Sequence, residues 1–142
     1  MSRGDCLNKA ELKRYLPLKK EAEELRLQAE RLAKDIKSLK AVAMDGMPKG
    51  NAVNDSIGNL VAKVDKLMRD YLYKYDEALC ELYKIERYIE SLDNETERLL
   101  MRKRYIEDKH WADICVELNY SWKQIHRIHS RILKKIAKDD TQ

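Results

Sequence analysis

The sequence predicts an all-α protein in which a long antiparallel coiled-coil helical hairpin is followed by a group of shorter helices. The 142 residues include only four Gly and two Pro, and 38% of them are charged. Strands would need alternating runs of β-branched residues, which the sequence lacks. Two long heptad patterns and a shorter amphipathic pattern near the C-terminus account for most of the chain, so we expect helices throughout.

Two long stretches carry apolar residues at alternating spacings of three and four, which is typical of a helix with one buried seam. The first seam comprises Leu18, Ala22, Leu25, Ala29, Leu32, Ile36, Leu39 and Ala43. The second comprises Ile57, Val61, Val64, Met68, Tyr71, Tyr75, Ala78, Leu82, Ile85, Ile89 and Leu92. Gly46, Pro48 and Gly50 lie between them and favour turns, so residues 45–54 are predicted to form the loop of an antiparallel hairpin.

The partners of the long helices are left open by the sequence. Pro17 is tolerated only near the start of a helix, so a separate short helix at residues 9–16 is expected before it. Leu72, Leu79 and Tyr83 form an apolar surplus beside the second seam. The N-terminal segment, the C-terminal helices or a second copy of the chain, in a homodimer through the coiled coil, would each cover this surplus. A structural spacer or dimerisation rod also explains both seams.

Residues 93–142 are predicted to form a separable helix-turn-helix domain, after an N-terminal region of residues 1–92. Asn94 suits a helix N-terminus, so helices are expected at residues 95–107 and then at 110–118. Asn119 tolerates a left-handed turn. Ser121 and Gln124 have the spacing of a capping box, which predicts a last helix at about residues 121–137.

The last helix carries apolar and basic residues on opposite faces. Its apolar face consists of Ile125, Ile128, Ile132 and Ile136. Residues 119–138 contain no acidic residue and six basic ones, namely Lys123, Arg127, Arg131, Lys134, Lys135 and Lys138. Because the whole chain has a net charge of +4, the remainder is net negative and the positive charge is concentrated on this helix. A cationic stripe roughly 100° wide can lie along a groove of duplex DNA.

We therefore expect the last helix to bind double-stranded DNA. The residues expected to read base edges are Trp122, Lys123, Gln124 and Arg127. Gln124 can pair bidentately with adenine, and Lys123 and Arg127 can donate to guanine. The residues expected to contact the DNA backbone are Ser121, His126, Arg131, Lys134, Lys109 and Arg104. A solvated helix surface is the simpler interpretation for Lys135 and Lys138.

The C-terminal third resembles sigma-70 region 4, the domain that reads the −35 promoter element. The resemblance is carried by LDNETERLLMRKRY at 92–105, WADICVELNYS at 111–121, IHRI at 125–128 and RILKKI at 131–136. The whole chain is similar to small phage and prophage proteins grouped with ArpU-type regulators of late transcription. This resemblance implies a contact with host RNA polymerase. Residues 122–124 replace a charged run of the sigma pattern, so a different promoter sequence is expected.

Other functions find less support in the sequence. The chain has no catalytic carboxylate pair, activated nucleophile or phosphate-binding Gly loop, so no enzyme and no cofactor are expected. His126 and His129 lack further metal ligands nearby, and the three cysteines are isolated, so no metal site is predicted. The sequence contains no membrane span or secretory signal, and we expect a protein of the bacterial host cytoplasm. The alternative is a protein-interaction module or a DNA-recognition subunit of phage packaging.

Overall fold

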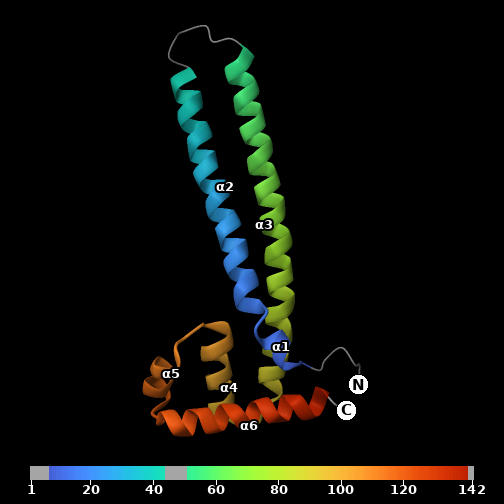
Figure 1. Cartoon of the computed structure of the whole chain (residues 1–142), viewed down its shortest axis with the longest axis vertical. Coiled ribbons are helices and arrows are strands. Elements are labelled where there is room, and N and C mark those ends of the chain that lie inside the picture. The colour runs from blue at the N-terminus through green and yellow to red at the C-terminus, as the bar shows by residue number, and fades with distance from the viewer. Residues whose placement is uncertain (1–6, 44–50, 141–142) are drawn as a thin grey trace. The chain divides into compact units, whose positions relative to one another are not determined.

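The computed structural model describes residues 7–43 and 51–140, which form helices and turns without a strand (Figure 1). The all-α prediction is confirmed for these residues. Among them, no helix has a stretch both long and apolar enough to cross a membrane. The chain divides into two compact units. We call residues 19–43 and 51–76 the long-helix unit, and residues 7–18 and 77–140 the C-terminal unit.

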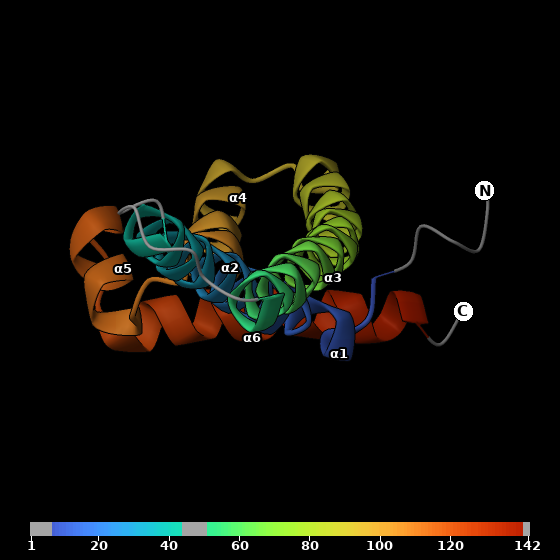
Figure 2. The same ribbon diagram turned by 90° about the horizontal axis from the view of Figure 1, so that it is seen from above.

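The long-helix unit consists of parts of α2 (Tyr15–Ala43) and α3 (Asn51–Ser91), which lie side by side (Figures 1 and 2). An ion pair of 3.2 Å joins Lys74 Nζ to Glu21 across the two helices. On α2, three predicted seam residues spaced by seven are buried, namely Ala22, Ala29 and Ile36. Two of them are alanines, whose small side chains let a neighbouring helix approach closely.

The buried row on α3 differs from the predicted seam. Val61, Met68 and Tyr75 were expected to be inside but are 39%, 39% and 44% exposed, so this part of the prediction is wrong. Leu60 and Leu67, each one residue earlier, are half-buried instead. Both rows have the same alternation of three and four, and α3 has apolar residues in each. Periodicity alone therefore could not distinguish the two rows.

The loop between the long helices is shorter at its C-terminal end than predicted. α3 begins at Asn51, so residues 51–54 are helical although they were assigned to the loop. Asn is unfavourable in a helix interior but is accepted at a helix start, where backbone groups lack helical partners. The remainder of the predicted loop, residues 45–50, lies outside the described residues.

The C-terminal unit is built around one apolar core. It comprises α1 (Lys9–Leu12), the first turn of α2, the C-terminal part of α3, α4 (Glu95–Met101), a π-helical turn η2 (Arg102–Ile106), α5 (Trp111–Leu118) and α6 (Trp122–Asp140). α6 packs against α1, α4 and α5. The largest fully buried side chains are Leu12, Ile85, Ile89, Leu100, Met101, Ile114, Ile125, Ile132 and Ile136. Residues from both ends of the sequence therefore share this core.

The boundary predicted between residues 92 and 93 runs through this core. Ile85 and Ile89 on α3 and Leu12 on α1 belong to the same buried cluster as the isoleucines of α6. The C-terminal helices thus share their core with residues that precede the predicted boundary. The predicted apolar surplus of α3, by contrast, is exposed, since Leu72, Leu79 and Tyr83 are 58%, 44% and 63% exposed.

The ends of the N-terminal helices follow the expected backbone rules. Asn8 caps α1, because its side chain accepts a hydrogen bond of 2.9 Å from the backbone N–H of Glu11. α1 ends at Leu12 rather than at residue 16, and α2 already begins at Tyr15. Pro17 is then the third residue of α2, where its missing N–H leaves no helical bond unmade. The short helix before Pro17 is confirmed, although it is shorter than predicted.

The first helix of the predicted helix-turn-helix changes its winding part-way. Asn94 caps it as expected by accepting a 3.2 Å hydrogen bond from the backbone N–H of Glu97. α4 ends at Met101, and η2 continues as a π-helical turn to Ile106. Asp108 then has φ 58°, a left-handed conformation that ends the helix. Residues 95–107 were predicted as one regular helix, and the π-helical turn was not foreseen.

Candidate nucleic-acid interface

The turn before α6 has the geometry that the sequence predicts. Asn119 follows α5 with φ 59° and ψ 41°, a left-handed conformation. The Ser121 hydroxyl accepts a hydrogen bond of 3.2 Å from the backbone N–H of Gln124, and Gln124 Oε1 accepts one of 3.0 Å from the backbone N–H of Ser121. The capping box is confirmed, and it fixes the first turn of α6.

α6 has a buried apolar face and an exposed basic face. Ile125, Ile132 and Ile136 are completely buried against the rest of the C-terminal unit. The opposite side carries Lys123, Arg127, Arg131 and Lys134, which we call the basic face. All four side chains are exposed, and none forms an ion pair or hydrogen bond with another described residue. Their charges therefore remain available to an anionic partner such as DNA phosphate.

Trp122 and His126 form a tilted aromatic pair at the start of α6. The Trp122 ring is 58% exposed and its centroid lies 4.4 Å from that of His126. His126 also lies 4.8 Å from Trp111 of α5, and its Nε2 is buried without a hydrogen-bond partner. Trp122 is thus accessible for the expected base contact. The expected backbone contact of His126 is limited to the atoms of its ring that solvent reaches.

Arg104 and Lys109, two further expected DNA contacts, bind within the C-terminal unit. The Arg104 guanidinium lies 4.8 Å above the Trp111 ring and donates a 3.0 Å hydrogen bond to the carbonyl of Lys109. Lys109 Nζ binds Glu117 at 2.6 Å, and Lys103 Nζ binds the same carboxylate at 2.5 Å. These two lysines lower the pKa of Glu117. Lys109 therefore has its charge offset by Glu117, whereas Arg104 keeps its charge but has its guanidinium held against Trp111.

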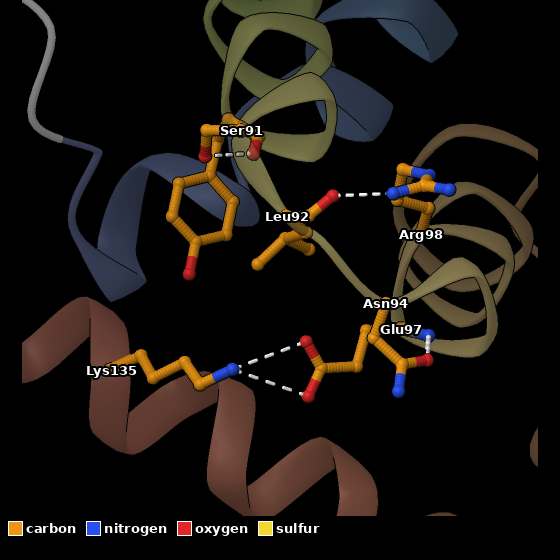
Figure 3. Close-up of polar contacts among 7 residues, drawn as sticks. Ser91, Leu92, Asn94, Glu97, Arg98 and Lys135 are labelled. Atoms are coloured by element: carbon orange, nitrogen blue, oxygen red, sulfur yellow. Dashed lines mark hydrogen bonds and ion pairs between the residues drawn. The ribbon is translucent and has the colours of Figure 1, made fainter.

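An ion pair between the buried Glu97 of α4 and the exposed Lys135 of α6 was not anticipated (Figure 3). Glu97 is only 4% exposed, and its two carboxylate oxygens lie 3.3 and 3.2 Å from Lys135 Nζ. Lys135 was interpreted as a solvated surface residue, but its ammonium group neutralises this carboxylate. The partners are 38 residues apart in the sequence, so no local pattern could have paired them.

Comparison with protein-family models, curated proteins and solved structures found no match to this chain. Four of the expected DNA contacts share the exposed basic face of α6, and Trp122 and Gln124 lie exposed in its first turn. His126, Lys109 and Arg104 are instead engaged in contacts within the fold.

His129 lies on the side of α6 that faces Tyr105 and Trp111, in a half-buried site that favours its neutral form. Its Nε2 is 2.6 Å from the Tyr105 hydroxyl, and its ring lies 4.7 Å from that of Trp111. Burial, together with the positive charges of His126, Arg104 and Lys13, lowers the pKa of His129 from 6.5 to about 4.

We expect His129 to make the fold less stable in mild acid. In the unfolded chain His129 takes up a proton near pH 6.5, whereas in the folded chain it does so only near pH 4. The stability contribution is therefore complete above pH 6.5 and is lost as the pH falls to 4, by about 2 kcal/mol after solvent screening. Melting temperatures of the His129→Gln variant across this pH range test the idea. His110→Gln, at an exposed histidine, is the matched control. A wild-type slope that persists in His129→Gln would contradict it.

Proposed function

We propose that this protein is a sequence-specific, double-stranded DNA-binding transcriptional regulator of phage or prophage type, and not an enzyme. In this proposal α5 and α6 form a helix-turn-helix that resembles sigma-70 region 4, with α6 as recognition helix. The long helices form an antiparallel coiled-coil hairpin that is available for a homodimer. The protein acts in the cytoplasm of a bacterial host, where it also contacts RNA polymerase.

The observation that carries this proposal is the unpaired basic face of α6. These four cations have no carboxylate partner among the described residues. The face lies opposite the completely buried Ile125 and Ile132, so the helix presents it on a rigid support. Lys and Arg side chains in this arrangement release counterions from DNA when they bind phosphate.

The position of each residue along α6 predicts its role in this complex. Lys123 and Arg127 lie in the first two turns, which in a helix-turn-helix contact base edges. Arg131 and Lys134 lie further along, where the helix diverges toward the backbone of the duplex. Trp122 and Gln124 lie in the same first turn and are also proposed to contact base edges.

Substitutions on the basic face are expected to separate sequence reading from phosphate binding. Arg127→Ala should remove a preference worth about 1–3 kcal/mol at one base pair, because a guanidinium fork can bind guanine bidentately. Lys134→Ala should weaken all duplexes alike and reduce the log-salt slope by about one unit. The measurement is selection from randomised duplexes, followed by salt titration of the best site.

Arg127→Lys is the matched control, because it keeps the charge and loses the fork. It should retain the wild-type salt slope and show a weaker base preference, because a lysine can donate to guanine but lacks the fixed fork of arginine. The proposal fails if the wild-type protein enriches no motif and binds duplex DNA no better than the Lys123→Glu/Arg127→Glu variant.

A protein-interaction module, or a DNA-recognition subunit of phage packaging, is the second candidate. It is favoured by the exposure of Val116 on α5, which is 77% exposed, and of Trp122. Apolar side chains at these positions suit a protein partner better than they suit phosphate. Failure of the duplex selection would favour this candidate.

A further inference from the structure

The amide of Gln124 is already half used by the fold. Its Oε1 accepts hydrogen bonds of 3.0 Å from the backbone N–H of Ser121 and 3.1 Å from the Ser121 hydroxyl. A backbone N–H can only donate, so the oxygen of the amide, and not its nitrogen, must face Ser121. The orientation of the amide is therefore fixed by the capping box.

The other end of this amide is free to act outside the protein. Gln124 is exposed in the first turn of α6, one helical turn before Arg127. Its Nε2 has no hydrogen-bond partner among the described residues. The group presented to an external partner is thus an N–H₂ donor without an accompanying acceptor.

We propose that Gln124 reads the major groove as a hydrogen-bond donor only, and so selects guanine or thymine over cytosine. This inference rests on the proposed function. Guanine presents the acceptors N7 and O6 in the major groove, and thymine presents O4. Cytosine presents the N4 amino donor, which would face the donor of Gln124 and leave both groups unpaired.

The same geometry argues against the bidentate pairing with adenine that the residue type alone suggests. That pairing needs Oε1 to accept from adenine N6 while Nε2 donates to adenine N7. Turning Oε1 toward the base would deprive the Ser121 N–H of its partner at the helix start. Adenine can then accept at N7 alone, with its amino group unpaired, so it ranks below guanine.

Gln124→Glu tests this inference, because Glu keeps the acceptor of the capping box and replaces the free donor by an acceptor. We expect selection from randomised duplexes to show one base pair at which the preference of wild-type protein changes by about tenfold in Gln124→Glu. If this pair contains adenine, wild-type protein should bind equally well when purine replaces it, because a donor-only contact does not use the adenine N6 amino group. Gln124→Ala should lose the preference and also melt at a lower temperature, whereas Gln124→Glu should melt as wild type.

The outcomes separate this inference from the proposed function. An adenine–thymine pair that responds to Gln124→Glu, and that wild-type protein binds more weakly when purine replaces the adenine, would overturn donor-only reading and leave DNA binding intact, because purine lacks only the N6 amino group. An identical motif in all three proteins would likewise remove Gln124 from base reading. If wild-type protein enriches no motif, the proposed function fails, and this inference fails with it.

Discussion

A fragment of residues 91–142 is expected to be largely unfolded in solution. The fragment keeps the helices of the proposed helix-turn-helix but loses part of their core. The buried side chains that it lacks are Leu7, Leu12, Tyr15, Ala78, Ile85 and Ile89. Their burial contributes on the order of 10 kcal/mol, which is as large as the whole stability of a typical domain. Far-UV circular dichroism should show a weak helical signal and no cooperative melting transition.

A matched control removes residues that lie outside this core. In it, residues 33–60 are replaced by a short Gly-Ser linker, which leaves every member of the buried cluster in place. This variant should retain a cooperative transition. A helical spectrum and cooperative melting for the fragment would instead show that the C-terminal helices fold without α1 and the end of α3.

Local features of the C-terminal helices could be predicted from sequence because their causes are local. The capping box of Ser121 and Gln124, the left-handed Asn119 and the cap at Asn94 each depend on residues a few positions apart. The buried face of α6 also follows from its own isoleucine spacing. The position and the basic face of the candidate interface were therefore accessible from residues 94–138.

Features that depend on distant residues could not be predicted in the same way. The register of α3 was misassigned because Val61 and Met68 adjoin leucines that fit the same period. The sharing of Ile85 and Ile89 with the core of the C-terminal unit depends on tertiary packing. The engagement of Lys109 by Glu117 also depends on how η2, the following turn and α5 pack together. Periodicity identifies a buried face but does not identify what covers it.

The function of individual charges depends on these distant pairings. From the sequence, Lys134 was expected to contact the DNA backbone, and the adjacent Lys135 was interpreted as a solvated surface residue. In the fold, Lys134 is exposed without a described partner, and Lys135 neutralises the buried Glu97. Substitution of Lys134 is thus expected to change DNA affinity, whereas substitution of Lys135 is expected to change stability.

Lys135→Met is accordingly expected to destabilise the C-terminal unit by about 3 kcal/mol. The Glu97 side chain is only 5% exposed, so its carboxylate would remain buried without a counter-charge. Methionine keeps most of the aliphatic length of lysine, so the loss reports the charge rather than the packing. Lys134→Met, the matched control on the adjacent exposed residue, should change stability by less than about 0.5 kcal/mol. Urea denaturation of both variants measures the difference.

Removing the carboxylate partner instead should cost less, because the Lys135 side chain is 55% exposed and its ammonium group can return to water. Glu97→Leu alone is therefore expected to cost less than about 1 kcal/mol, and the Glu97→Leu/Lys135→Met double variant should recover most of the stability lost in Lys135→Met. Such a recovery follows only if the single variant suffers from an isolated buried charge. Equal stabilities for Lys135→Met and Lys134→Met would instead mean that solvent or another group neutralises Glu97.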